Sequence, residues 1–180
     1  MDPIKIIENH YHPESQTFRL LVRHGEQVAE KALAVADRVV HLNPDRTFLR
    51  EAAMLHDIGI YMTDTPQLGC RGHHPYVCHG ILGRMILEPL ELNRHAMVCE
   101  RHVGVGLTVD EIKQHRLPLP LRDMLPVTLE EEIICYADKF FSKDNGGSKT
   151  AKSIDEIIAG LKRYGDGGVM RFEAWVERFE

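Results

Sequence analysis

FLREAAMLHDIG, at positions 48–59, joins an apolar helical pattern to an adjacent histidine and aspartate. Its apolar side chains recur three and four residues apart, which is the spacing of one face of an α-helix. Gly59 follows this pattern where a glycine commonly ends a helix. His56 and Asp57 therefore stand at the last turn of a predicted helix. Neighbouring side chains on a continuous helix diverge by about 100°, whereas at an ending turn both can point at one centre.

Helical periodicity also dominates the rest of the chain. Residues 18–40 carry apolar side chains at helical spacing, and Gly25 is expected to divide this run into two helices. Pro44 is expected to start the helix that contains the quoted stretch. Because no segment alternates convincingly as a strand does, the sequence predicts an all-α fold. Further helices are expected over residues 75–87, 92–101, 108–115, 128–141, 154–164 and 168–179.

Capping patterns and turn residues mark the boundaries of these helices. Thr108 with Glu111, and Ser153 with Glu156, have the spacing of a capping box. Residues 63–75 include two prolines and two glycines and form a long predicted loop, which we expect to cover a site. A second, glycine-rich loop is expected at residues 145–148.

The bulk composition is that of an ordinary globular protein. The 180 residues are 43% hydrophobic and 27% charged, which fits one domain with a buried core. The net charge of -5 argues against binding a nucleic-acid polymer. No segment approaches the roughly 20 apolar residues of a membrane span, and the N-terminus does not resemble a signal peptide. The four cysteines form no CxxC pair, so we expect reduced, buried thiols in a cytoplasmic protein.

Eleven histidines are more than a chain of this length usually carries, which favours metal or proton chemistry. A His-Asp pair alone is also explained by a buried histidine bonded to its neighbour. Two distant residues favour a metal: His24 lies on an apolar helical face, and Asp138 lies in an apolar helical stretch. An unpaired buried carboxylate costs several kcal/mol. Imidazole and carboxylate ligands suit iron, manganese or zinc, and the lack of thiolates argues against a structural zinc.

The order of these residues resembles the HD superfamily of metal-dependent phosphohydrolases. The chain has, in this order, a first histidine, a His-Asp pair and a distant aspartate followed by a lysine. The letters HDIG at positions 56–59 match the subgroup of that name. The resemblance covers about residues 18–142 and leaves a C-terminal helical extension of about 153–180. It implies one HD domain over residues 1–180, built as a helical bundle. It also implies four metal ligands, which are His24, His56, Asp57 and Asp138.

His79 and His102 lie between the signature positions, where superfamily members with two metals also place histidines. The resemblance therefore implies two divalent ions, bridged by Asp57, with His79 and His102 on the second. Iron, manganese or zinc is expected, with magnesium and nickel as further candidates. The alternative is a single metal with two core histidines beside it. The chain lacks the lysine and the Gly-Tyr-Pro motif of HD-GYP proteins, so hydrolysis of cyclic di-GMP is not expected.

The resemblance further implies hydrolysis of a nucleotide or related phosphoester by metal-activated hydroxide attack, with His56 and Asp57 at the catalytic centre. Arg101 directly precedes the predicted ligand His102, and Lys139 directly follows the predicted ligand Asp138. Both are expected to assist catalysis. Each could equally be solvated or ion-paired. Further candidates for contacting the substrate phosphate are Arg23, Arg71, His73 and His74.

Three functional interpretations are compatible with these residues. The first is a phosphohydrolase acting on a small phosphorylated molecule. The second is a metal-containing module that binds or senses a nucleotide without turnover. The third, a purely structural metal, is disfavoured by the His and Asp ligands. The apolar face at Phe172, Trp175 and Phe179 is expected to pack on the domain or on a second copy in a homodimer.

Overall fold

The computed structural model describes residues 1–143 and 151–180, so the loop predicted at 145–148 lies outside the described residues. The α-helices are α1 Pro3–Glu8, α2 Gln16–Arg38, α3 Arg46–Leu55, α4 His79–Leu87, α5 Asn93–Arg101, α6 Val109–Gln114, α7 Leu129–Asp138, α8 Ile154–Leu161 and α9 Asp166–Phe179. Short 3-10 turns are η1 Val40–Leu42, η2 Ile58–Met62, η3 Pro66–Leu68, η4 Tyr76–Cys78, η5 Glu88–Leu90 and η6 Lys162–Tyr164. The fold is all-α, as predicted.

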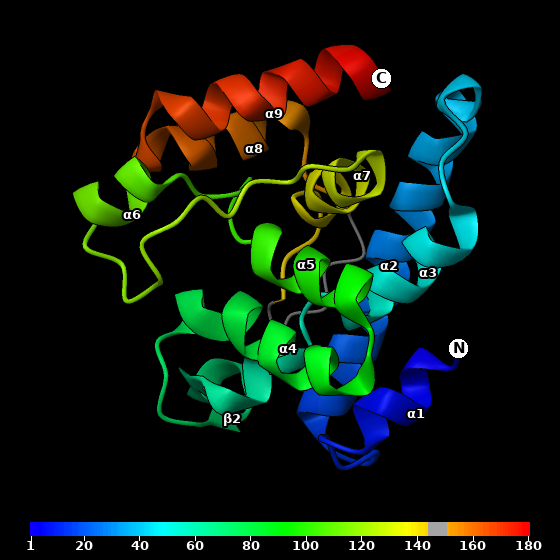
Figure 1. Ribbon diagram of the computed structural model, residues 1–180, viewed down its shortest axis with the longest axis vertical. Helices are drawn as coiled ribbons and strands as arrows, with labels where there is room; N and C mark the ends of the chain where they lie inside the picture. The colour runs from blue at the N-terminus through cyan, green and yellow to red at the C-terminus, as the bar shows by residue number, and fades with distance from the viewer. Residues whose placement is uncertain (144–150) are drawn as a thin grey trace.

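The long helix α2 organises the bundle. Ser15 caps its first turn by accepting a hydrogen bond from the backbone of Phe18. It packs along α3 and crosses α7, while α4 packs against α5 and η2 (Figure 1). Helices α2, α3 and α7 share one apolar core with α8 and α9. Residues of α4, α5 and η2 contribute to a second apolar core. The ends of α3, α5 and α7 meet between these two cores.

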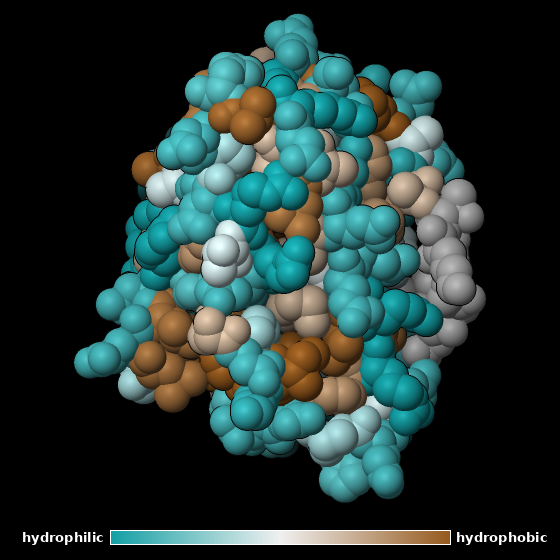
Figure 2. Space-filling model, turned by 90° about the vertical axis from the view of Figure 1, so that its right-hand side faces the viewer, coloured by the Kyte–Doolittle hydropathy of each residue, from teal (hydrophilic) through white to brown (hydrophobic). Residues whose placement is uncertain are grey.

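The C-terminal helices α8 and α9 lie next to each other and cover α7 (Figure 1). Phe172 of α9 stacks on the buried Tyr136 of α7, with ring centroids 5.3 Å apart. Trp175 and Phe179 are buried in the same core. The apolar face of α9 therefore packs on its own domain. On the face that Figure 2 shows, hydrophilic side chains cover most of the surface, with apolar ones in smaller groups.

Several boundaries differ from the sequence expectations. Gly25 was expected to divide two helices, but α2 runs through it. A Cβ at this position would lie 3.0 Å from the Cα of Met54, so the glycine allows α2 and α3 to approach closely. The helix predicted to start at Pro44 begins at Arg46, because Asp45 is its N-cap. The helix predicted through residue 141 ends at Asp138.

The segment 63–75 was expected to be a loop that covers a site, and no strand was expected. It contains a two-stranded antiparallel sheet, β1 Asp64–Thr65 with β2 Cys70–Arg71. The hydroxyl of Thr17 on α2 donates to the carbonyl of Leu68, which holds this segment on the side of α2. None of its residues lines the cavity described below. Across the described residues, no helix has the length and apolar character needed to cross a membrane.

Candidate metal centre

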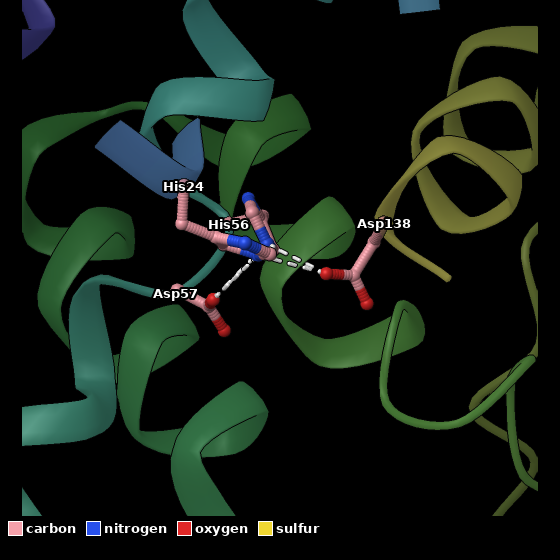
Figure 3. Close-up of side chains that lie close together, drawn as sticks. All are labelled: His24, His56, Asp57 and Asp138. Carbon is pink, nitrogen blue, oxygen red and sulfur yellow. Dashed lines mark hydrogen bonds and ion pairs between the residues drawn. The ribbon is translucent and has the colours of Figure 1, made fainter. Parts of the chain in front are cut away.

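The six predicted ligands come together from five different helices. His24 lies in the middle of α2, His56 and Asp57 directly follow α3, and His79 begins α4. The other two, His102 and Asp138, stand at helix ends, and every residue in the set is at most 5% exposed. Figure 3 shows the imidazoles of His24 and His56 and the carboxylates of Asp57 and Asp138 pointing toward one another. His102 directly follows α5 and Asp138 is the last residue of α7.

Three of the histidines are oriented in the same way. Each ring donates to the backbone carbonyl three residues earlier, and for His56 and His102 this is one of the last carbonyls of an α-helix, which lack partners within the helix. Nδ1–H of His56 donates to the carbonyl of Ala53 at 2.6 Å, and that of His79 to Tyr76 at 2.6 Å. Nδ1–H of His102 donates to the carbonyl of Cys99 at 2.8 Å. This hydrogen bond selects the tautomer in which Nε2 is free to bind a metal.

His24 is the exception. Its Nε2 faces the cluster, but its buried Nδ1 has no hydrogen-bond partner among the residues that the structure describes. Its ring is held by burial on the apolar face of α2 and by its contact with the tilted ring of His56, at a centroid distance of 5.2 Å. The first histidine therefore lacks the carbonyl that fixes the other three.

The free nitrogens and the carboxylates form two groups that share Asp57. In the first group, Nε2 of His24 lies 2.9 Å from Oδ1 of Asp138 and 3.4 Å from Oδ2 of Asp57. Nε2 of His56 lies 3.1 Å from the same Oδ2 of Asp57 and 3.4 Å from Oδ1 of Asp138. One oxygen of each carboxylate and two imidazole nitrogens thus face a common centre.

The second group uses the other oxygen of Asp57. Nε2 of His79 and Nε2 of His102 each lie 3.3 Å from Oδ1 of Asp57. The two nitrogens are 3.0 Å from each other. The ring of Tyr76 stacks on that of His79 at 4.6 Å and screens it from solvent. Asp57 therefore stands between the two groups with one oxygen directed at each.

This arrangement fits divalent cations. It brings lone pairs together in a dry site, where unpaired acceptors repel and are costly. Neither oxygen of Asp57 has a well-aligned hydrogen bond among the described residues, although the ammonium of Lys143 lies 2.9 Å from Oδ2. Ligand atoms about 2.1 Å from one metal ion lie roughly 3.0 to 3.4 Å apart, and the nitrogen–oxygen distances in the two groups run from 2.9 to 3.4 Å. Nitrogen and carboxylate donors suit iron, manganese and zinc.

The site's own charges prepare it for such an ion. Burial lowers the pKa of His24 to about 4 and that of His79 to about 3, so these imidazoles are neutral at pH 7. Burial alone would also lower the pKa of His56, but the carboxylates of Asp57 and Asp138 raise it to about 9. Nearby positive groups keep the pKa of both carboxyls well below their usual range despite burial. Metals bind neutral imidazoles and ionised carboxylates, so His24, His79 and both carboxylates are already in the binding form, whereas His56 must release a proton when an ion binds.

Lys143 belongs to the site, although the sequence did not single it out. Its Nζ lies 2.9 Å from Oδ2 of Asp57 and 3.5 Å from Oδ1 of Asp138, and its side chain is 13% exposed. The two carboxylates raise the pKa of this ammonium well above its usual range, although burial opposes the shift. The helix was predicted through residue 141, which would carry Lys143 away from the cluster. Because α7 ends at Asp138, the chain turns and brings it back.

Of the positive residues predicted for catalysis and phosphate binding, some lie beside the metal-type ligands and others do not. Lys139 lies beside the cluster, with Nζ 2.8 Å from Oδ2 of Asp138. The guanidinium of Arg101 is directed at Glu131 instead, at 2.8 and 3.0 Å from its two oxygens. Arg23 is half-buried on α2. Three candidates are exposed in segment 63–75 and do not line the cavity next to the cluster, and these are Arg71, His73 and His74.

A cavity of about 580 Å³ opens onto the second group. His79, His102 and Asp138 line its inner end together with Lys139 and Lys143. Its other walls are mainly apolar and come from η4, from residues 103–107 and from the C-terminal helices. A small molecule can therefore reach the candidate metal centre with two ammonium groups beside it.

Comparison with known proteins places this arrangement in a family. The family model described as HD domain matches residues 17–142, a range that contains all six candidate ligands. The chain belongs to the HD domain family. This match confirms the predicted resemblance to the HD superfamily, and HD domains bind divalent metals.

Three relatives of this HD domain come from three different organisms. An uncharacterised protein of Methanocaldococcus jannaschii is 33% identical over 144 residues, covering 74% of this chain and 75% of the relative. Two proteins named tRNA (cytidine(56)-2'-O)-methyltransferase also match. The one from Picrophilus torridus is 34% identical over 126 residues and the one from Thermoplasma volcanium 30% over 125 residues, each covering 69% of this chain. The chain spans only 32% of the length of either methyltransferase.

Among solved structures, the HD domain of the L. monocytogenes phosphodiesterase PgpH has a similar fold. Its TM-score is 0.54 at 18% sequence identity, and the alignment covers 94% of this chain and 87% of that one. The likeness supports the helical HD architecture and includes most of the C-terminal extension.

Proposed function

We propose that this HD domain is a metal-dependent phosphohydrolase that cleaves a small phosphoester, with a nucleotide as the substrate class. The observation that carries the proposal is the position of Asp57, whose two oxygens face two separate groups of metal-type ligands at the inner end of a cavity. His24, His56 and Asp138 would hold one ion with Asp57, and His79 and His102 the other. Iron, manganese or zinc fits these donors.

Bound divalent ions would supply a water of lowered pKa and positive charge for the phosphoryl oxygens. The chain contributes the rest of the chemistry. The carbonyls of Ala53, Tyr76 and Cys99 keep three imidazoles in the required tautomer and orientation. Lys139 and Lys143 place ammonium groups where the phosphate of a ligand in the cavity would lie. These lysines would bind oxygens that the ions leave free.

Replacement of Asp57 by alanine tests the proposal. Purified protein loaded with Mn(II) or Fe(II) should hydrolyse bis-p-nitrophenyl phosphate, and D57A should lose at least about 100-fold in kcat/KM, as expected for a residue on which both groups depend. Asp64, an exposed aspartate of β1, supplies the matched control. D64A should retain wild-type turnover, and unchanged turnover in D57A would remove Asp57 from the mechanism.

A module that binds a nucleotide without turnover is the alternative use of the same site. A wild-type protein that binds both metal and nucleotides but hydrolyses none of a broad phosphoester panel would favour it.

A further inference from the structure

The cavity extends well beyond the metal-type ligands. Its outer part is built by α6 and by the C-terminal elements α8, η6 and α9. Of these, only the C-terminal elements lie outside the region matched by the family model. In Figure 1, α6 lies beside the junction of α8 and α9. Leu161, Tyr164 and Gly168 of these C-terminal elements face His115 and Leu117 across this part of the cavity. The extension therefore forms a wall of the same cavity that the HD core opens onto.

Arg171 fixes this wall to the core. Its Nη2 lies 2.7 and 2.9 Å from the two oxygens of Glu111 on α6 and also donates to the carbonyl of Gly106. Its Nε donates to the carbonyl of Val105, three residues after His102. These bonds hold the start of α9 against both α6 and the segment that follows a candidate ligand. They also pair both oxygens of the Glu111 carboxylate with the guanidinium, so the two charges offset each other in the cavity wall.

The outer cavity is consequently suited to an uncharged group. Apart from the Glu111–Arg171 pair, the described residues that line it are mostly apolar, with Val105, Leu107 and Leu161 as examples. The ammonium groups lie at the opposite, inner end. A volume of about 580 Å³ falls within the range of roughly 300 to 1,000 Å³ typical of small-molecule sites. A phosphate alone would leave the apolar walls without a partner.

Two aromatic rings stand at the rim of this apolar part. Tyr164 is 70% exposed, although it lines the cavity. Its backbone carbonyl accepts a hydrogen bond of 3.1 Å from Nε2–H of His115, and the two rings meet edge to face at 6.5 Å. The backbone of η6 is thus tied to α6 while the phenol ring remains available. An exposed ring at the mouth of an apolar cavity is a surface on which a flat group can stack.

We propose that the outer cavity binds the nucleobase of the substrate and that Tyr164 is the specificity-determining residue on which the base stacks. The inference rests on the proposed function, in which the phosphate lies at the inner end beside Lys139 and Lys143. The C-terminal extension then selects the substrate, while the HD core carries out the hydrolysis. An aliphatic chain is the other group that apolar walls could accept, and the experiment below separates the two.

Equilibrium titration of the Mn(II)-loaded protein tests the proposal without requiring turnover. The probes are adenosine 5'-monophosphate, ribose 5-phosphate, which lacks only the base, and decyl phosphate. Wild type should bind the nucleotide at least about tenfold more tightly than ribose 5-phosphate, because stacking on an aromatic side chain contributes roughly that factor or more per base. Y164A should lose this difference while its affinity for ribose 5-phosphate and its metal content stay unchanged.

Two further variants separate stacking from folding. Y164F keeps the ring and should retain the nucleotide affinity within about twofold. M170A removes an exposed side chain of α9 that does not line the cavity, and it should behave as wild type. Equal affinity of wild type for the nucleotide and ribose 5-phosphate would overturn the proposal. So would unchanged nucleotide binding in Y164A, or tighter binding of decyl phosphate than of the nucleotide.

The outcome is distinguishable from failure of the proposed function. A protein that hydrolyses bis-p-nitrophenyl phosphate but shows no Tyr164-dependent preference for the nucleotide retains its function and loses this subsite. A protein that binds the nucleotide through Tyr164 but hydrolyses no phosphoester retains the subsite and is not a hydrolase.

Discussion

The Nε2 atoms of His79 and His102 lie 3.0 Å apart, although each ring already donates its Nδ1 proton to a backbone carbonyl. Two neutral imidazoles held in this way direct lone pairs at each other and at Oδ1 of Asp57. Burial lowers the pKa of both rings, so a proton is a poor bridge between them at pH 7. A divalent cation would satisfy all three atoms.

Removing the His79 side chain should therefore abolish binding of one metal ion and leave binding of the other unchanged. H79A is expected to lose about one metal equivalent, because His24, His56 and Asp138 do not depend on it. Elemental analysis after anaerobic purification, with circular dichroism to verify folding, measures the effect. The control is H95A, since His95, which lies on α5, is also a buried histidine but lies outside both groups. Unchanged metal content in H79A would indicate a single-metal site.

Lys143 should compete with the metal of the first group. Its ammonium lies 2.9 Å from Oδ2 of Asp57, an oxygen that His24 and His56 also face. K143M removes this competing charge, so Mn(II) affinity should rise about tenfold, which corresponds to about 1.4 kcal/mol. Turnover should fall, because an ammonium beside the substrate phosphate is lost. Calorimetric titration and kcat/KM give the two results.

The control for Lys143 is K5M, which makes the same change at an exposed lysine of α1. It should alter neither metal affinity nor turnover. Weaker metal binding in K143M would show instead that the lysine supports the site. A rise in affinity together with a fall in turnover is the combination that only a competing, phosphate-binding ammonium explains.

The difference between His24 and Lys143 shows how far the sequence could lead. His24 and Asp138 could be found because polar residues on apolar helical faces need a partner, and both lie in stretches with clear helical periodicity. Lys143 could not, since its position depends on α7 ending at Asp138 rather than at residue 141. Arg101 was expected near the substrate because it precedes His102, but it turns toward Glu131, which is distant in sequence. Helical periodicity predicts faces, whereas helix ends and long-range ion pairs depend on tertiary packing.

Gly59 has a packing role that explains why a glycine follows the His-Asp pair. A Cβ on this residue would lie 2.3 Å from the carbonyl oxygen of His79 and 2.4 Å from the backbone nitrogen of Gly83. The glycine thus lets η2 contact α4 directly and sets His79 beside Asp57. G59A should destabilise the fold by about 3 kcal/mol, since backbone atoms cannot move aside as a side chain can. Urea unfolding measures this change.

G160A is the control for Gly59, because a Cβ on this helical residue of α8 meets no atom within 4 Å. Alanine there should leave stability equal or raise it by up to about 1 kcal/mol, as expected for a glycine replaced within a helix. If G59A unfolds at the same urea concentration as wild type, η2 and α4 can separate without cost, and the close contact does not position His79.

Glu180 should make the packing of α9, and with it the wall that carries Tyr164, dependent on pH. Its carboxylate accepts a 2.7 Å hydrogen bond from the hydroxyl of Tyr136 on α7 and pairs with Lys31 and Arg38 of α2. Burial raises its pKa, but these partners lower it from the ordinary value of 4.5 to about 2. A lowered carboxyl pKa stabilises the fold above pH 4.5, and this contribution disappears as the pH falls toward 2.

Replacing Glu180 by glutamine should therefore lower the free energy of unfolding at pH 7 by about 1 kcal/mol, the upper range for partly exposed ion pairs. The deficit relative to wild type should shrink steadily below pH 4.5 and vanish near pH 2. Urea unfolding at pH 7, 4 and 2.5 follows the difference, and E177Q, at an exposed glutamate of the same helix, is the control. A deficit of equal size at all three values would mean that lost packing, rather than lost charge, separates glutamine from glutamate at this position.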